Sequence, residues 1–302
     1  MLFDISKAGI EELHDELFDE KQVGVSVLRL DKIHPVVSGN KLFKLHYFLE
    51  EAHSSTHKTI LTFGGAYSNH LSATAYACKL LQLKSIAIVR GEKPAQLSPT
   101  LQQCLQDGMQ LKFISRNEYA EKDGDAFINH LKKEFGECTI VPEGGYHPSG
   151  AKGAALMMGL VKDSSYTHIC MATGTAATLA GILMAARPEQ TIAAFPALKG
   201  MTDNKARIKE LTKQEDEFKN LLILNDYHFG GYAKKNAELV AFMNNCWMKY
   251  RLPLDFVYTA KMFFGVVDCI KNDTFKKGSK ILCLHTGGLQ GNKSLPLNTL
   301  LF

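Results

Sequence analysis

The strongest constraint on the fold is a repeating order of segments along the chain: a short apolar run, then glycines or other small residues, then a stretch with helical periodicity. Because strands that alternate with helices form parallel sheets with helices on both faces, this order predicts an α/β fold. The predicted strands are residues 59–63, 85–89, 110–114, 138–141, 167–171, 191–195, 221–224 and 280–284.

The length and charge of the chain exclude several classes of protein. Its 302 residues suggest roughly two domains or one large α/β unit. The net charge is only +4, and we interpret the densest basic stretch, residues 271–280, as a solvated loop or helix end. No apolar run approaches the ~18 residues of a membrane span. We therefore expect neither nucleic acid nor a membrane as a partner.

The cysteines and the N-terminal segment indicate a cytoplasmic protein. Seven cysteines are present, an odd number without C-x-x-C spacing, and several of them, such as Cys170 and Cys283, lie inside apolar runs. This pattern is typical of reduced, buried thiols and not of disulfides or a metal site, so we expect no metal. Residues 1–10 already hold Asp4 and Lys7, which argues against a signal peptide.

Three loops of small and polar residues follow predicted strands, at residues 64–70, 173–178 and 285–288. In α/β sheets, ligands bind at the carboxyl ends of the strands, where such loops lead into the next helix. If the three strands belong to one sheet, the loops converge on a single crevice.

The second loop has the composition of an anion-binding loop. Its small residues would let the backbone of a helix N-terminus approach a phosphate, and Thr175 and Thr178 could add hydroxyl donors. The same residues are also compatible with an ordinary capped helix after a glycine turn. The loop lacks the lysine of a Walker A motif and is not G-x-G-x-x-G, which argues against a nucleotide site.

Two further features have both a functional and a purely structural interpretation. Ser68, Asn69 and His70 begin a predicted helix, where they would either bind a carboxylate or simply cap the helix. Lys41 lies in the first turn of the helix predicted from Asn40, where the helix dipole disfavours an ammonium. A lysine that forms a Schiff base needs such a lowered pKa, although an isolated lysine is more often a surface residue.

Taken together, five motifs in this order resemble those of fold type II pyridoxal-phosphate enzymes. More closely, they resemble the branch that contains 1-aminocyclopropane-1-carboxylate deaminases and D-cysteine desulfhydrases. The resemblance covers roughly residues 20–290. The motifs are G-N-K at 39–41, G-G-A-Y-S-N-H at 64–70, the small-residue loop at 173–178, V-Y-T-A-K at 257–261 and H-T-G-G at 285–288. Two positions depart from the branch, because Phe43 replaces a common arginine and Ala177 replaces a common glycine.

The resemblance implies a tryptophan-synthase-β-like fold, in which two α/β lobes with open parallel sheets hold pyridoxal 5'-phosphate in the cleft between them. The large cofactor-binding lobe would comprise residues 1–45 and 155–302. The small lobe, residues 46–154, would carry the Ser-Asn-His loop. A homodimer is the family expectation.

The resemblance also implies roles for individual residues. Lys41 would form the Schiff base with the cofactor and act as the base, and Ser68 and Tyr258 would be the other catalytic residues. The substrate would be bound by Ser68, Asn69, His70 and Tyr232, although Tyr232 is also compatible with a structural role. Besides Lys41, the expected cofactor contacts are Asn69, Gly174, Thr175, Ala176, Ala177, Thr178 and Thr286.

The group beside the pyridine nitrogen of the cofactor separates two reactions. In the deaminases of this branch a glutamate follows the late tyrosine, whereas here Thr259 follows Tyr258, and Thr286 is a second hydroxyl candidate. A hydroxyl leaves the ring largely neutral, which suits β-elimination better than opening of a cyclopropane ring. The sequence therefore favours deamination of a small amino acid, as in D-cysteine desulfhydrase, to an α-keto acid and ammonia. The alternatives are 1-aminocyclopropane-1-carboxylate deaminase and a non-catalytic protein that binds a phosphate metabolite.

Overall fold

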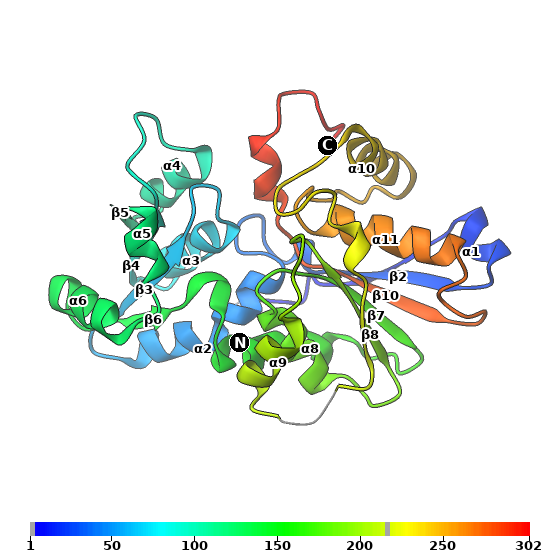
Figure 1. The fold of residues 1–302 in the computed structure, drawn as a ribbon, viewed down its shortest axis with the longest axis horizontal. Coiled ribbons are helices and arrows are strands. Elements are labelled where there is room, and N and C mark those ends of the chain that lie inside the picture. The colour runs from blue at the N-terminus through cyan, green and yellow to red at the C-terminus, as the bar shows by residue number, and fades with distance from the viewer. Residues whose placement is uncertain (1–3, 215–217) are drawn as a thin grey trace.

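Two separate β-sheets organise the chain (Figure 1). The computed structural model describes residues 4–214 and 218–302. Residues 1–3 of the segment predicted not to be a signal peptide lie outside the described residues, as do residues 1–3 and 215–217 of the predicted large lobe. The six-stranded sheet has the order β1 (Ile10–Leu13), β2 (Gly24–Arg29), β10 (Lys280–His285), β7 (His168–Thr173), β8 (Thr191–Pro196) and β9 (Leu221–Ile223). The four-stranded sheet has the order β5 (Gln110–Ile114), β4 (Lys84–Arg90), β3 (Thr59–Gly64) and β6 (Thr139–Val141).

All neighbouring strands run parallel except the edge strand β1, which pairs antiparallel with β2. The α-helices are α1 (Glu16–Glu20), α2 (Asn40–Ser54), α3 (Asn69–Leu80), α4 (Pro99–Gln106), α5 (Arg116–Ala120), α6 (Asp125–Phe135), α7 (Pro148–Ala155), α8 (Ala177–Ala185), α9 (Asn204–Thr212), α10 (Ala237–Tyr250) and α11 (Thr259–Lys271). The short 3-10 helices are η1 (Leu30–Lys32), η2 (Glu143–Gly145), η3 (Leu156–Leu160), η4 (Asn225–Tyr227) and η5 (Leu289–Ser294).

Helices cover both faces of each sheet, because every buried strand carries apolar residues in both directions. Along β10, Leu282 and Leu284 pack with α2, α7, α8 and α9, whereas Ile281 and Cys283 pack with α1, α10 and α11. The four-stranded sheet is covered by α5 and α6 on one face and by α3 and α4 on the other. The result is an α/β architecture of two open sheets, as predicted.

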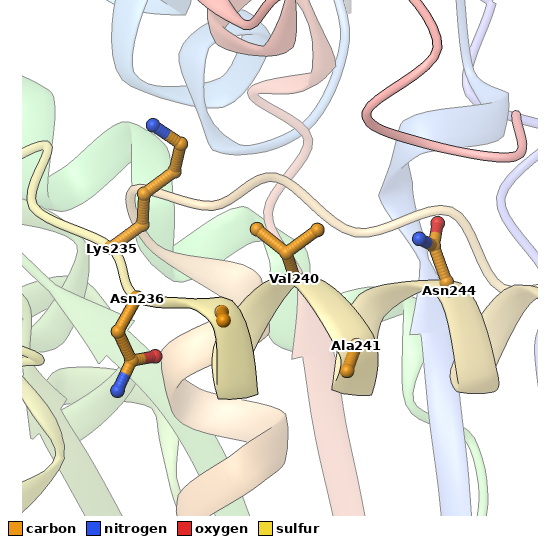
Figure 2. A pocket seen from close by; sticks show the side chains of 6 residues that line it. Lys235, Asn236, Val240, Ala241 and Asn244 are labelled. Atoms are coloured by element: carbon orange, nitrogen blue, oxygen red, sulfur yellow. The ribbon is translucent and has the colours of Figure 1, made fainter.

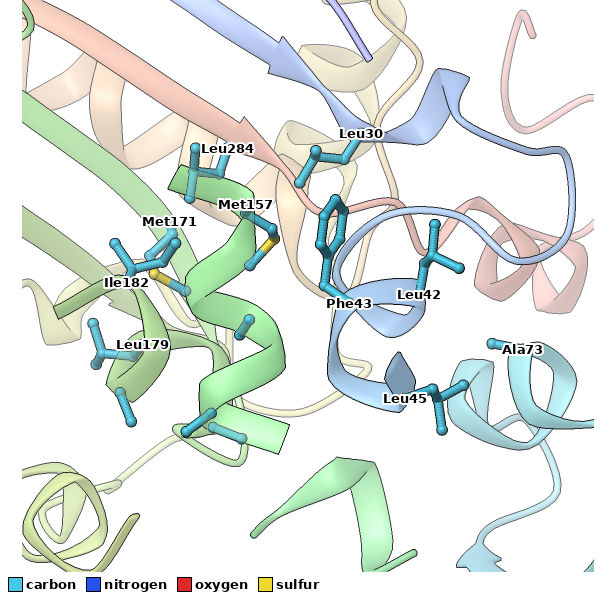
Figure 3. Packing of buried hydrophobic residues seen from close by; sticks show 14 of the residues in the cluster. Leu30, Leu42, Phe43, Leu45, Ala73, Met157, Met171, Leu179, Ile182 and Leu284 are labelled. Atoms are coloured by element: carbon cyan, nitrogen blue, oxygen red, sulfur yellow. The ribbon is translucent and has the colours of Figure 1, made fainter. Parts of the chain in front are cut away.

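Helix α2 joins the two sheets. Its apolar residues belong to a core that also contains strand residues of both sheets, such as Ile60 of β3 and Leu284 of β10. Phe43 is fully buried in this core, near Leu30 and Met157 (Figure 3). An apolar ring therefore occupies the position at which the resemblance would place an arginine.

The eight strands predicted from the sequence are all present, with ends that differ by at most two residues. Strands β1 and β2 were not among the predicted strands. Strand β1 is the antiparallel edge strand and carries two glutamates, so its pattern is not that of a buried strand. Helices α2 and α3 begin within one residue of the predicted positions 40 and 68.

One condition set by the sequence analysis is not met, because the three polar loops do not follow strands of a single sheet. Strand β3 belongs to the four-stranded sheet, whereas β7 and β10 belong to the other. The predicted lobes, residues 1–45 and 155–302 against 46–154, remain a proposal. Both of their boundaries fall inside helices, α2 and α7.

The seven cysteines are all buried and free, which agrees with their position in apolar runs. Within residues 4–214 and 218–302, no helix combines the length and the apolar character needed to cross a bilayer.

Close contact of α7 with α2 depends on Gly153. A Cβ atom at this position would lie 2.1 Å from the carbonyl oxygen of Phe43. Gly153→Ala should therefore lower the free energy of unfolding by about 1–3 kcal/mol, although alanine is the better helix former. The matched control is Gly159→Ala, whose Cβ would meet nothing within 4 Å, and we expect a change within about 0.5 kcal/mol. Urea unfolding measures both, and equal effects would contradict this packing.

Candidate active site

A cavity of about 990 Å³ opens at the carboxyl ends of β3, β7 and β10, and all three polar loops line it. Its size is at the upper end of the range for small-molecule sites. The cavity receives residues from both sheets, so the loops converge even though their strands do not share a sheet. A second hollow of about 540 Å³ runs along α10 between Lys235 and Asn244 (Figure 2). Its lining has a single titratable side chain, Lys235, so it offers little catalytic chemistry.

Lys41 is held in the cavity wall by its neighbours. Its Nζ donates to Oδ1 of Asn40 at 2.8 Å, and Nδ2 of Asn40 donates to Oγ1 of Thr178 at 2.8 Å. Gly39 has a φ of +65°, and a Cβ there would lie 1.9 Å from the carbonyl oxygen of Thr286, so only glycine allows this approach. Burial lowers the pKa of Lys41 from 10.5 to about 8, although the carboxylate of Asp255 opposes the shift. A larger share of this amine is therefore neutral near pH 7 than of an ordinary lysine.

A second lysine, Lys44, lies in the same wall and was not among the predicted site residues. It is 3% exposed, and its Nζ donates to the carbonyl oxygen of Gly144. Burial and the charge of Lys41 hold its pKa well below the ordinary value. The spacing of three residues from Lys41 on one helix was the available signal. The two lysines make this part of the cavity suitable for an anion.

The loop at residues 174–178 has the geometry of an anion site. Ala176 adopts a left-handed conformation, with φ at 65°, and α8 begins immediately after it without a side-chain cap. The backbone N–H groups of the first turn are therefore available to an anion. Gly174, Thr175, Ala176 and Thr178 line the cavity, whereas Ala177 is buried and does not. Thr173, which the sequence analysis did not select, also lines the cavity, with a buried Oγ1 that has no partner.

Ser68 and Asn69 face the cavity from the start of α3. Oγ of Ser68 accepts a hydrogen bond from the backbone N–H of Leu71, which makes Ser68 the helix cap, and its own hydroxyl proton remains available. Nδ2 of Asn69 donates to the carbonyl oxygen of Gly288 at 3.3 Å, so it connects this helix to the H-T-G-G loop. Oδ1 of Asn69 is buried without a partner.

His70 also lines the cavity, but its imidazole is already engaged. Oγ1 of Thr62 donates to the carbonyl oxygen of Val141 and therefore accepts from Nε2 of His70, at 2.8 Å. Burial and the nearby lysines hold the pKa of His70 well below 6.5, so the ring is neutral and carries its proton on Nε2. Its Nδ1 has no partner and cannot donate. His70 could thus donate to a substrate carboxylate only through its backbone N–H.

Tyr232 and Tyr258 form an edge-to-face pair with ring centroids 6.0 Å apart. Tyr258 also lies against Gly174, where a Cβ would come within 3.1 Å of its ring. Burial, followed by the neighbouring Tyr232, holds the pKa of Tyr258 well above 10. Tyr258 therefore remains a hydroxyl donor at neutral pH. Tyr232 is half exposed at the cavity.

The two threonines that could face a pyridine nitrogen differ in their surroundings. Thr286 lines the cavity. Thr259 is fully buried outside it, and its Oγ1 donates to Oδ1 of Asp255 and accepts from the backbone N–H of Asp255, both at 2.8 Å. Asp255 also accepts from the backbone N–H groups of Val257, Tyr258 and Thr259. Asp255 thus binds the backbone at the start of α11, and Thr259 holds its carboxylate.

Several charged residues at the cavity were not predicted. They come from several elements and loops without a common motif, and only Asp203 and Arg207 are paired, four residues apart. The residues are Arg90, Glu143, Lys199, Asp203, Arg207 and Lys235.

These observations fit pyridoxal phosphate. An uncapped helix start and two lysines in one cavity suit its phosphate, and the amine of Lys41 suits its aldehyde. Asn69, whose Oδ1 has no partner, and Thr286 line the same cavity. Tyr258 packs against the loop that would hold the phosphate.

Comparison with known proteins agrees with this assignment. The family of pyridoxal-phosphate dependent enzymes matches residues 13–287, and the chain belongs to this family. It is 29% identical to the mitochondrial bifunctional D-cysteine desulfhydrase/1-aminocyclopropane-1-carboxylate deaminase of Arabidopsis thaliana, over 84% of this chain and 70% of that protein. It is 26% identical to the 1-aminocyclopropane-1-carboxylate deaminase of Bradyrhizobium sp. (strain ORS 278), over 83% of this chain and 82% of that protein.

Solved structures show the same fold. A crystal structure of a deaminase homologue of this type superimposes with a TM-score of 0.80 at 26% identity, over 96% of this chain and 92% of the other. Threonine deaminase isoform 2 of Solanum lycopersicum reaches a TM-score of 0.67 at 14% identity, over 93% and 79%, which concerns the fold alone. The predicted class, fold type II with pyridoxal phosphate as cofactor, is therefore confirmed.

Lys41 is the residue that we expect to bond to the cofactor. Borohydride reduction of the loaded protein, followed by peptide mass spectrometry, should place the pyridoxyl group on Lys41 and not on Lys44. The rate at which the cofactor-free protein takes up pyridoxal phosphate should rise as the pH increases through about 8, because only the neutral amine attacks a carbonyl. Label on Lys44, or uptake independent of pH, would contradict the assignment.

Proposed function

We propose that this enzyme deaminates a small amino acid by β-elimination, as a D-cysteine desulfhydrase does. One observation carries the choice of reaction: Thr286 offers a hydroxyl to the cavity, whereas the hydroxyl of Thr259 is bonded to Asp255. The carboxylate that deaminases of the related branch carry after the late tyrosine is thus absent, and its replacement does not line the cavity.

A hydroxyl partner selects among reactions through its effect on the pyridine ring. Bound pyridoxal phosphate supplies an electron sink that weakens the bonds at the α-carbon of the substrate. A hydroxyl leaves the pyridine nitrogen largely neutral, and this sink is sufficient when the β-substituent departs with the electron pair. Opening a cyclopropane ring has no such leaving group. Thr286 therefore favours elimination over ring opening.

The proposed cofactor contacts follow from the cavity wall. Lys41 would hold the cofactor covalently, and its amine would then move the α-proton of the substrate. The backbone N–H groups of residues 174–178 would bind the phosphate, with the hydroxyls of Thr175 and Thr178. Ala177 would contribute through its backbone only, since its side chain does not line the cavity. Asn69 would contact the cofactor through Oδ1, which has no other partner.

The substrate would lie on the α3 side of the cavity. The hydroxyl of Ser68 and the backbone N–H groups of Asn69 and His70 are placed to bind its carboxylate, where the positive end of the helix dipole adds to the attraction. The hydroxyl of Tyr258 stays protonated because its pKa is raised, so it can donate to the departing β-substituent. Tyr232 would cover the substrate from the exposed side of the cavity.

Two features of the proposal concern the whole molecule. We propose that the chain acts as a homodimer in the cytoplasm. The resemblance supports the dimer, and the seven buried cysteines, none of them in a disulfide, are compatible with a reducing compartment. Light scattering coupled to size-exclusion chromatography measures the mass directly. A mass of one chain at micromolar concentration would overturn the dimer.

The reaction is tested by comparing substrates. The purified protein, loaded with pyridoxal phosphate, should release keto acid and ammonia from D-cysteine with a higher kcat/KM than from L-cysteine or 1-aminocyclopropane-1-carboxylate. Lys41→Ala is the control and should abolish turnover. The alternative reaction is ring opening of 1-aminocyclopropane-1-carboxylate, for which the Bradyrhizobium relative is named. A preference for the cyclopropane substrate would establish it and contradict the argument from Thr286, while a protein that turns over none of the panel would contradict the proposed reaction.

The two threonines give a matched pair of variants. Thr286→Val should shift the absorbance maximum of the bound cofactor and lower kcat for D-cysteine, with little effect on unfolding. Thr259→Val should instead remove a helix-cap partner of buried Asp255 and lower the free energy of unfolding by about 0.5–2 kcal/mol, with the absorbance unchanged. The reverse pattern would show that Thr259, not Thr286, faces the cofactor.

A further inference from the structure

The loop that carries Tyr232 has an unfavourable backbone conformation. Phe229, Gly230, Gly231 and Ala233 have φ values of 51°, 90°, 117° and 54°. Two of these residues are not glycine, so their left-handed conformation costs free energy that other contacts must offset. Tyr232 itself is half exposed and lies among these residues. A loop with this backbone strain is held in one conformation by contacts with residues outside the loop.

Lys261 provides such a contact from the core. It lies in the first turn of α11, is 1% exposed, and its Nζ donates to the carbonyl oxygens of His228 and Gly231, at 2.8 and 2.7 Å. A buried ammonium is stable only when its charge and its protons are compensated. Burial lowers its pKa from 10.5 to about 8, with Asp255 opposing the shift. The ammonium thus joins the two ends of the turn that immediately precedes Tyr232.

Lys261 also belongs to the segment that carries the second tyrosine. Tyr258 precedes it by three residues, packs against Gly174 and meets the ring of Tyr232 edge to face. The carbonyl contacts of Lys261 therefore fix the Tyr232 loop to the same helix start that places Tyr258. Lys261 does not line the cavity, so it has no direct contact with a substrate there.

We propose that Lys261 is a positioning residue that holds the loop at residues 228–231 and thereby places Tyr232 against Tyr258 over the substrate. The inference rests on the proposed function, in which Tyr232 contacts the amino acid. Lys261 acts only through the loop, so its removal should weaken substrate binding and leave the attachment of the cofactor unchanged.

The test uses Lys261→Met in the protein loaded with pyridoxal phosphate, with Lys271→Met, an exposed lysine of the same helix, as the control. Hydrogen exchange of residues 228–235 should become about tenfold faster in Lys261→Met only, because two hydrogen bonds to a charged donor are lost. The KM for D-cysteine should rise about tenfold while kcat changes less than about twofold. The absorbance of the bound cofactor should stay the same. Unchanged exchange would overturn the proposal.

A double mutant separates the positioning role from a general loss of structure. If Lys261 acts through Tyr232, its replacement should have no further effect on KM in a Tyr232→Ala background. An additional rise in KM in that background would overturn the proposal. Should Lys261→Met fail to fold, Lys261→Gln, which keeps N–H donors on a shorter side chain, takes its place with the same expected directions.

The same measurements distinguish this inference from the proposed function. If exchange becomes faster in Lys261→Met but KM rises only in Tyr232→Ala, the positioning role alone is overturned. If exchange becomes faster in Lys261→Met but KM changes in neither variant, the substrate contact of Tyr232 in the proposed function is overturned. The effect of Lys261 on the substrate is then overturned with it.

Discussion

The site depends on two lysines in the wall of one cavity: Lys44 is buried, and Lys41 is partly buried. Removing a charge from water costs several kcal/mol unless it is compensated. Lys41 donates to an amide oxygen and Lys44 to a backbone carbonyl, and the carboxylate of Asp255 only partly opposes the effect of burial on the pKa of Lys41. Both pKa values are therefore depressed. The site is suited to an anionic cofactor, and one amine is available near neutral pH to react with its aldehyde.

Tight backbone contacts keep these lysines in place. Gly39 allows the turn before Lys41 to touch the backbone of Thr286, and Gly153 allows α7 to reach the backbone of Phe43. Helix α2 is thus fixed against the H-T-G-G loop at one end and against α7 along its length. Because α2 contributes to the core between the two sheets, the position of Lys41 depends on both of them.

Local patterns predicted much of this from the sequence, and long-range contacts account for what they did not. The strand and helix order and the composition of the loop at residues 174–178 depend on neighbours in the chain, whereas the role of Lys41 is implied by the resemblance and stays a prediction. The burial of Lys44, the tautomer of His70 and the bond from Thr259 to Asp255 depend on side-chain packing. For His70 the deciding partner is Thr62, which in turn donates to Val141 in a different strand. No periodicity in the sequence carries that information, and β1, an antiparallel edge strand with two glutamates, gave too weak a pattern.

We infer that residues 174–178 and Lys41 together hold pyridoxal phosphate at the junction of the two sheets. The decisive measurement is a crystal structure of the protein grown with pyridoxal phosphate. We expect the phosphate on the backbone N–H groups at the start of α8 and continuous electron density from Nζ of Lys41 to the cofactor. A phosphate bound elsewhere in the cavity, or a cofactor not bonded to Lys41, would contradict it.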